Sequence, residues 1–228
     1  MLHPPETFAI AKPVIRASGG IVAAQHWEAA EAGAAVLRAG GNAIDAAIAT
    51  ALAIGCVEPW MSGIGGGGYM LIALAAEKKV YRIDYGMVAP KRLDPGRYAL
   101  ANHGEAPEDF TFVWPRVVDD RNIMGPESVG TPGAVAGFAA ALARFGTLSW
   151  AEALKPAIDL ADKGMPTDWY QTLQIAYGAA AGLGRYPESA KTYLPGGVPP
   201  VSLSSHAPKR IRLGRLAVLR RRHLARVL

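Results

Sequence analysis

The chain has 228 residues, 50% of them hydrophobic and 19% charged, which suits one large or two small folded domains and excludes a disordered polymer. Its single cysteine, Cys56, excludes an internal disulfide framework and a cysteine-rich metal cage. The formal net charge of +5 suggests an anionic partner such as nucleic acid, but the distribution of the basic residues along the chain matters more than their sum.

Residues 1–20 form an N-terminal extension that contains three prolines and no apolar run typical of a signal peptide. No stretch of the chain reaches the roughly 18 uncharged apolar residues that a membrane span requires. We therefore expect no membrane span and a cytoplasmic location.

Two helices are predicted next. Apolar residues recur at helical spacing over residues 25–39, and Gly40 and Gly41 are typical helix terminators. Asn42 can cap a second helix over residues 43–56, which is apolar on nearly all sides and therefore belongs in a core.

A glycine loop and a hairpin follow. Residues 62–68 read SGIGGGG, which is too glycine-dense for a helix or strand interior, so Gly65, Gly66, Gly67 and Gly68 are expected to form a tight structural loop. The β-rich runs at residues 69–75 and 80–85 are separated by four residues, the pattern of a hairpin.

A second helical block begins near residue 131. Thr131 and Pro132 are a possible cap and first residue of a helix that ends at Gly146, and Ser149 and Glu152 have capping-box spacing for the next helix. A third helix is predicted from about residue 167 to 175, and the Gly- and Pro-rich text after residue 182 predicts a long loop.

Residues 204–228 carry eight Lys or Arg and no acidic residue, whereas the preceding 203 residues carry 16 basic and 19 acidic ones. Three interpretations of this basic tail remain open. The first is an arm that binds nucleic acid or an anionic membrane, the second is a disordered terminus, and the third is the product of a change of reading frame in G+C-rich DNA.

Familiar catalytic signatures are absent. Gly63, Gly65 and Gly68 match G-x-G-x-x-G with Asp84 downstream, but a helix precedes them and a hairpin follows, the reverse of a dinucleotide-binding unit. No G-x-S-x-G motif is present, and the five histidines lack the spacing of a triad or a metal site. Cys56 lies in an apolar segment typical of a buried thiol. The sequence thus predicts no metal and no cofactor.

Three blocks of the sequence together resemble the amino-terminal half of the large subunit of gamma-glutamyltransferases (gamma-glutamyltranspeptidases). They are the helix start GGNAIDAA, the run SGIGGGGYMLI before the first strand, and the helix start GTPGAVAGF. The similarity runs from about residue 21 to residue 201. It divides the chain into an extension (1–20), a family-like portion (21–203) and the basic tail (204–228).

The resemblance implies an α+β fold of the N-terminal-nucleophile hydrolase type, an αββα sandwich that is present here only as an incomplete N-terminal portion. It also implies a precursor that cleaves itself, after which a new N-terminal Thr attacks a gamma-glutamyl carbonyl with its own amine as base. No Thr of this chain stands in the family's Thr-Thr-His context. We therefore expect no catalytic residue in this chain, no activity of its own, and a partner in the small subunit or the remainder of the enzyme.

The resemblance also singles out residues 84–86 as candidates for the substrate pocket. Family transferases read D-F-R-E after the second hairpin strand, and that Arg grips the α-carboxylate of the gamma-glutamyl group. The matching residues here are Asp84, Tyr85, Gly86 and Met87. Loss of the guanidinium predicts a gamma-glutamyl-like or other amide substrate that is held differently.

The leading hypothesis is therefore a truncated gamma-glutamyltransferase-like hydrolase. The alternative is a non-catalytic binding module that uses its basic tail on nucleic acid or an anionic membrane.

Overall fold

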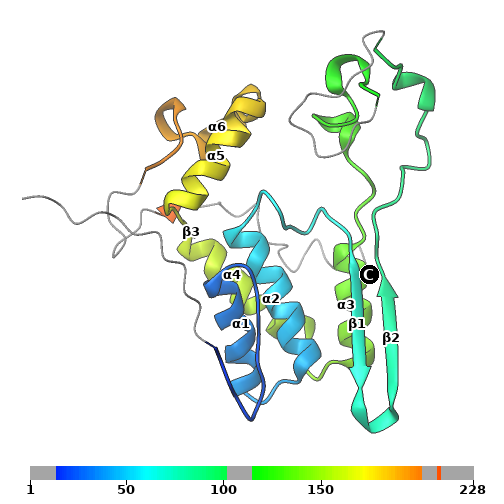
Figure 1. Cartoon of the computed structure of the whole chain (residues 1–228), viewed down its shortest axis with the longest axis vertical. Coiled ribbons are helices and arrows are strands. Elements are labelled where there is room, and N and C mark those ends of the chain that lie inside the picture. The colour runs from blue at the N-terminus through cyan, green and yellow to red at the C-terminus, as the bar shows by residue number, and fades with distance from the viewer. Residues whose placement is uncertain (1–13, 102–114, 202–209, 212–228) are drawn as a thin grey trace, which may run out of the picture.

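The computed structural model describes residues 14–101, 115–201 and 210–211. Helices dominate these residues, and two short antiparallel sheets accompany them (Figure 1). The helices are α1 (Trp27–Arg38), α2 (Ala43–Val57), α3 (Ala134–Phe145), α4 (Trp150–Lys163), α5 (Trp169–Ala181) and α6 (Pro187–Tyr193). The strands are β1 (Tyr69–Leu74), β2 (Lys79–Asp84), β3 (Met165–Pro166) and β4 (Arg210–Ile211).

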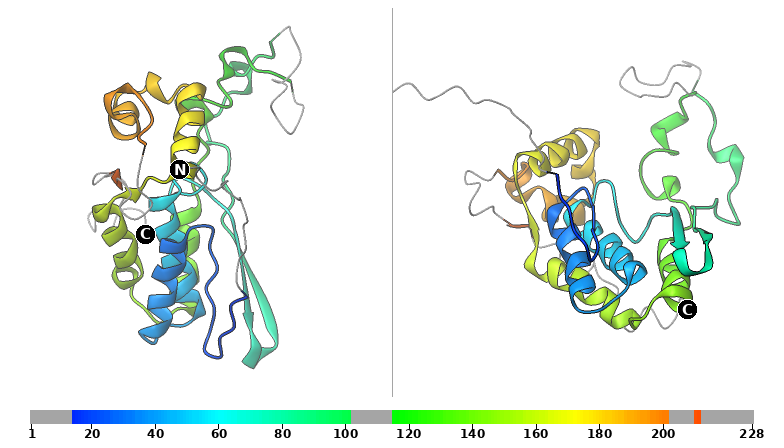
Figure 2. Two further views of the ribbon diagram at one scale, coloured as in Figure 1. Left: turned by 60° about the vertical axis from the view of Figure 1, so that its left-hand side comes forward. Right: turned by 60° about the horizontal axis from the view of Figure 1, so that its bottom comes forward.

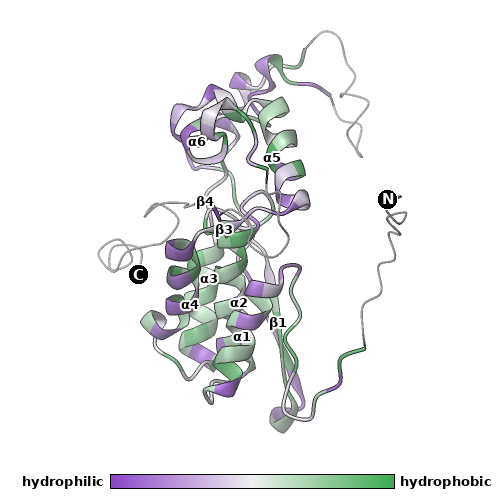
Figure 3. Cartoon of the chain, turned by 90° about the vertical axis from the view of Figure 1, so that its left-hand side faces the viewer, coloured by the Kyte–Doolittle hydropathy of each residue, from purple (hydrophilic) through white to green (hydrophobic). Residues whose placement is uncertain are grey.

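Helix α2 is the centre of the helical layer and packs against both α1 and α4. Its sequence is apolar on nearly every side, and it buries nine of its residues, among them Ile48 and Leu52. Figure 3 shows α2 almost wholly in the hydrophobic colour, whereas hydrophilic bands alternate along α4. An all-round apolar helix requires neighbours on several faces, which explains why α2 is central.

The amino-terminal cap of α2 is also a tertiary junction. Asn42 caps α2 as predicted, and Asp45 completes a reciprocal capping box with it. Asp45, fully buried, also accepts hydrogen bonds from the backbone N–H groups of Thr147 (2.9 Å) and Leu148 (3.1 Å) and from the Thr147 hydroxyl (2.6 Å). Burial alone would raise the pKa of Asp45, but these hydrogen bonds outweigh it and the pKa is lowered. Asp45 therefore ties the turn between α3 and α4 to α2.

Strands β1 and β2 form the predicted hairpin, with Tyr69 opposite Asp84 and Leu71 opposite Arg82. One face of the hairpin packs against the main core, through Ile72 of β1 and the neighbouring helix α3. The other face is open, and Tyr69, Leu71 and Val80 are each at least two-thirds exposed. Residues 86–101 and 115–132 then extend away from the helical layer before the chain returns to α3 (Figures 1 and 2).

Two expected elements differ in the structure. Helix α3 begins at Ala134 with Gly133 as its cap, and no side chain caps it. Thr131 does not cap α3 because its backbone pairs with Val88 in an isolated β-bridge. The sequence after residue 182 contains helix α6 rather than only a loop. Pro187 lies in the first turn of α6, where backbone N–H groups have no acceptor within the helix, so the N–H that proline lacks is not missed.

Two residues of the basic tail are described, and both contact the body of the chain. Arg210 and Ile211 pair with Pro166 and Met165. Arg210 also donates a hydrogen bond of 2.6 Å to the buried carboxylate of Glu28, which lies in α1. The rest of the basic tail, residues 204–209 and 212–228, lies outside the described residues.

Candidate functional site

The structure brings three separate sequence blocks together at the end of the hairpin: the glycine loop (62–68), the segment 84–87 after β2, and the start of α3 (131–138). The backbones of Gly68 and Tyr85 exchange two hydrogen bonds, of 3.0 and 3.3 Å. The N–H groups of Gly133 and Ala134 both donate to the carbonyl oxygen of Gly66, at 3.1 and 3.0 Å. The glycine loop thus caps α3 with its own carbonyl, which satisfies donors that a side chain would otherwise serve.

The four glycines of the loop are not equivalent. A Cβ atom at Gly67 would lie 2.6 Å from the nitrogen of Met87 and 2.7 Å from the oxygen of Tyr85, so only glycine fits there. A Cβ at Gly68 would lie 3.2 Å from the Tyr85 ring, and one at Gly66 would lie 3.4 Å from the carbonyl oxygen of Gly63. A Cβ at Gly65 would meet no atom within 4 Å. Close backbone approach is therefore concentrated at Gly67.

Tyr85 is the side chain around which the three blocks pack. Its ring meets Phe138 edge to face, with centroids 5.4 Å apart, and a Cβ at Gly137 would lie only 2.3 Å from its Cγ atom. Burial raises the pKa of the Tyr85 phenol. The hydroxyl donates a long hydrogen bond of 3.5 Å to the carbonyl oxygen of Tyr69. Tyr85 therefore holds the junction together; of its two neighbours in the sequence, one is exposed and the other is half-buried.

Asp84 and Gly86 are those neighbours. Asp84 is exposed, and its Oδ1 atom accepts a hydrogen bond of 3.1 Å from the N–H of Gly86. Its Oδ2 atom lies 3.6 Å from the guanidinium of Arg82. A Cβ at Gly86 would meet only the Asp84 carboxylate at 3.4 Å and the Tyr69 hydroxyl at 3.7 Å. Gly86 therefore leaves room for a side chain that this protein does not have.

Arg82 does not fill the position at residue 86. Four residues separate the two, which is about 13 Å along an extended strand at roughly 3.3 Å per residue. The Arg82 guanidinium is also exposed and lies next to Asp84. The side chains nearest Gly86 are thus the Tyr69 phenol and the Asp84 carboxylate, which is paired with Arg82.

Sequence reasoning did not single out four residues that build this site: Tyr69, Gly133, Gly137 and Phe138. The last three lie in the quoted GTPGAVAGF block, but their contact with Tyr85 depends on tertiary packing. The hairpin register, which places Tyr69 opposite Asp84, is the signal that could have identified Tyr69.

Other candidate chemistry is limited in the described ranges. Burial raises the pKa of the Cys56 thiol to about 11, so it is protonated and unreactive at neutral pH. Within residues 14–101, 115–201 and 210–211, no three His, Cys, Asp or Glu side chains gather as metal ligands. The helices of this part are all too short or too polar to cross a bilayer.

Comparison with known proteins gives one consistent family. The family model described as Gamma-glutamyltranspeptidase matches residues 29–209. The Acylase ACY 1 proenzyme of Pseudomonas sp. (strain V22) is 42% identical over 192 residues, which are 84% of this chain and 33% of that protein. The glutathione hydrolase proenzyme of Bacillus subtilis (strain 168) is 38% identical over 165 residues, which are 72% of this chain and 26% of that protein. The chain therefore spans about a third or less of these relatives.

Solved structures agree with the sequence relatives. Helicobacter pylori gamma-glutamyltranspeptidase aligns with a TM-score of 0.70 at 31% identity, over 82% of this chain and 50% of that one. Cephalosporin acylase from Bacillus halodurans aligns with a TM-score of 0.70 at 26% identity, over 92% of this chain and 36% of that one. The expected fold class is confirmed: the chain is part of an α+β fold of the N-terminal-nucleophile hydrolase type.

Proposed function

Because the chain belongs to the gamma-glutamyltranspeptidase family, we propose that it is the amino-terminal portion of an acyl-transferring hydrolase whose nucleophile lies in a remainder of the enzyme. The relatives are named as proenzymes, and this chain spans only a third or less of them. None of its Thr residues stands in the family's Thr-Thr-His context. The chain alone is therefore inactive, and the remainder is its partner. The relatives give no support to a nucleic-acid-binding module.

In this proposal the complete enzyme does not bind its acyl donor by a contact between an arginine and an α-carboxylate, the contact that the family's transferases make. The open position at Gly86 is the observation that carries this proposal. A guanidinium at this position would offer two charge-assisted hydrogen bonds, each worth about 1.5–3 kcal/mol. The relatives include proteins named acylases as well as glutathione hydrolases, which fits a donor other than glutathione. We propose an amide whose acyl group lacks the amino-acid head group.

The test uses a chimera in which residues 14–211 of this chain, which include the family-matched residues 29–209, replace the corresponding part of the Acylase ACY 1 proenzyme of Pseudomonas sp. (strain V22). The substrates are γ-glutamyl anilide and butyryl anilide, which has the same carbon chain without the carboxylate and the amine. We expect the chimera to prefer butyryl anilide and the isolated 228-residue chain to cleave neither. Turnover by the isolated chain would disprove its inactivity.

A matched pair of variants then tests the role of Gly86. Gly86→Arg in the chimera should raise the preference for γ-glutamyl anilide by about tenfold or more, which corresponds to one charge-assisted hydrogen bond. Gly86→Ala, whose Cβ fits the site, should leave the preference unchanged. An equal preference in both variants would show that residue 86 does not face the acyl group. The cytoplasmic location remains a separate proposal, which cell fractionation would test.

A further inference from the structure

The hydroxyl of Tyr69 lies beside the open position at Gly86. A Cβ atom at Gly86 would be 3.4 Å from Asp84 Oδ1 and 3.7 Å from the Tyr69 hydroxyl. The Tyr69 side chain is exposed, so a ligand at this position can contact it. The phenol is therefore the uncharged hydrogen-bonding side chain closest to the place where the family's transferases carry an arginine.

The register of the hairpin explains why the hydroxyl lies there. Gly68 and Tyr85 exchange two backbone hydrogen bonds. The next pair along the ladder, Tyr69 with Asp84, is therefore a non-hydrogen-bonded pair, whose side chains lie closest together. Both of these side chains point away from the face that carries Tyr85, because side chains alternate along a strand. Gly86 is then the diagonal neighbour of Tyr69, within reach of a long aromatic side chain.

The Tyr69 hydroxyl is available to a ligand. In the part of the chain that the structure describes it has no hydrogen-bond partner, although the Tyr69 carbonyl oxygen accepts a hydrogen bond from Tyr85. A long side chain at residue 86 would begin 3.7 Å from the hydroxyl and would lie across it. The glycine at residue 86 thus removes one hydrogen-bonding group from the site and uncovers another.

The charges beside the phenol balance each other. Asp84 Oδ2 lies 3.6 Å from the Arg82 guanidinium, and Asp84 Oδ1 accepts a hydrogen bond from the N–H of Gly86. The carboxylate repels a second anion, and the guanidinium next to it repels a second cation. A phenol both donates and accepts hydrogen bonds, as an uncharged amide or hydroxyl does. The site therefore favours an uncharged polar group over a carboxylate or an ammonium group.

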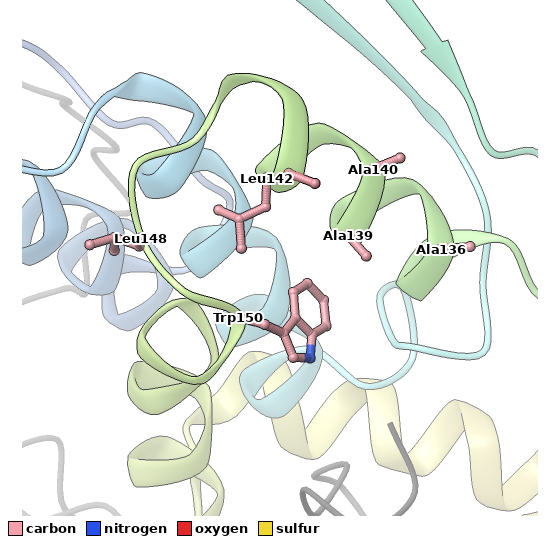
Figure 4. Close-up of a pocket in the computed structure, with 7 residues that line it drawn as sticks. Ala136, Ala139, Ala140, Leu142, Leu148 and Trp150 are labelled. Carbon is pink, nitrogen blue, oxygen red and sulfur yellow. The ribbon is translucent and has the colours of Figure 1, made fainter. Parts of the chain in front are cut away.

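The apolar groove along α3 offers no such contact. This groove has a volume of about 450 Å³, and four alanines of α3 line it together with Leu142, Leu148 and Trp150 (Figure 4). The indole Nε1 of Trp150 is the one polar side-chain atom of the lining, and it is buried, without an acceptor among the described residues. A ligand in the groove cannot reach a buried atom. The polar end of an acyl group is therefore better bound at Tyr69.

We propose that Tyr69 is a specificity-determining residue, whose hydroxyl binds an uncharged hydrogen-bonding group, a carboxamide, at the end of the acyl chain. This inference rests on the proposed function, because it takes residue 86 to face the acyl group. It adds the chemical class of the acyl end. A glutaramoyl group carries its carboxamide on the same carbon at which a γ-glutamyl group carries its α-carboxylate, so the two ends reach equally far.

Three anilides that differ only at the end of the acyl chain test the proposal in the chimera defined above. Glutaramoyl anilide ends in a carboxamide, glutaryl anilide ends in a carboxylate, and a third anilide of the same chain length ends in an isopropyl group of similar shape. We expect the highest kcat/KM for the carboxamide. Tyr69→Phe keeps the ring and removes the hydroxyl. It should lower kcat/KM for the carboxamide by about two- to tenfold, the value of one neutral hydrogen bond, and leave the isopropyl substrate unchanged.

Tyr177→Phe is the matched control, because it removes the same group from another exposed tyrosine, which lies on α5. It should change none of the three values. An equal ratio of carboxamide to isopropyl turnover in the parent chimera and in Tyr69→Phe would overturn the proposal, and so would a preference of the parent for the carboxylate.

Calorimetric titration of the chimera with the same anilides gives a measurement that does not depend on turnover. The Kd for the carboxamide should rise by about two- to tenfold in Tyr69→Phe, whereas the Kd for the isopropyl compound should stay constant. A chimera that does not bind the carboxamide, or that binds it equally with and without the hydroxyl, would overturn the proposal. The comparison of γ-glutamyl with butyryl anilide reports the proposed function separately, so the two failures are distinguishable.

Discussion

Tyr85 and Phe138 meet edge to face, with ring centroids 5.4 Å apart, although 53 residues of sequence separate them. This contact fixes the segment 84–87 against the start of α3, with the glycine loop between them. Asp84, which is exposed, and Gly86, which is half-buried, flank Tyr85 in the sequence. The packing contact between Tyr85 and Phe138 therefore fixes where Asp84 and Gly86 lie.

Gly137→Ala tests this packing. The added Cβ would lie 2.3 Å from the Tyr85 Cγ atom, so Tyr85 or α3 must shift. We expect the free energy of unfolding of the chimera to fall by about 1–3 kcal/mol, the usual cost of overpacking, although alanine favours the helix more than glycine does. Denaturant unfolding is the measurement. Gly65→Ala is the control, because its Cβ meets no atom within 4 Å; an equal loss in both variants would contradict the assignment.

The open face of the hairpin should make the isolated chain prone to aggregation. Tyr69, Leu71 and Val80 are 68%, 72% and 68% exposed, and a two-stranded hairpin leaves unpaired strand edges. Leu71→Glu places a carboxylate opposite Arg82 and should reduce both light scattering and dye binding by the isolated chain. The same change should destabilise the chimera if the remainder covers this face. A cooperative thermal transition of a soluble wild-type monomer would contradict the expectation.

His26 makes the stability of the fold sensitive to pH below about 6.5, the ordinary pKa of a histidine. Its Nδ1 atom accepts a hydrogen bond of 3.1 Å from the N–H of Glu28 and caps α1. Burial lowers the pKa of His26 from its ordinary value of 6.5, against the raising effect of the Glu28 and Asp168 carboxylates; Arg210 lowers it further. The unfolded chain therefore binds the proton first as the pH falls. The stability contributed by neutral His26 is fully present above pH 6.5 and is lost as the pH falls towards the lowered pKa.

His26→Asn keeps a capping side chain but does not titrate. We expect this variant of the chimera to have a flatter dependence of its melting temperature on pH from 7 to 5 than the parent protein. Parallel pH profiles would show that the imidazole does not remain neutral in the folded state.

Glu28 joins α1 to both the end of α4 and the tail. Its Oε1 atom lies 2.8 Å from Lys163 Nζ and 2.6 Å from Arg210 Nη2, and the side chain is only 3% exposed. Burial alone would raise the pKa of Glu28, but hydrogen bonds from Lys163 and Arg210 outweigh it and the pKa is lowered. Glu28→Gln leaves two cations without their anion and should destabilise the chimera by about 3 kcal/mol, the lower end for a broken buried pair.

Glu31→Gln is the matched control for this prediction. It removes the same charge from an exposed pair with Arg38 on the same helix, and such pairs contribute little. Unfolding in urea should therefore separate the two variants clearly. Equal stabilities would show that the Glu28 pairs are as weak as surface ones.

The features that the sequence determined by itself are those with local causes. The cap at Asn42 and the capping box of Ser149 with Glu152 form as predicted, because each needs only residues within one helix turn. The hairpin follows from two short β-rich runs separated by four residues. The family was evident from three sequence blocks, and the matched relatives confirm it.

The tertiary structure decided what depends on distant partners. Thr131 has the local pattern of a helix cap, but no side chain caps α3. The N–H groups of Gly133 and Ala134 donate hydrogen bonds to the carbonyl oxygen of Gly66. His26 is buried, although it stands at the very start of α1. The pairing of Glu28 with Arg210, the room at Gly86 and the unpaired indole of Trp150 were equally unpredictable. Each of these features arises from groups that local sequence spacing does not bring together, so only the folded chain determines which donor meets which acceptor.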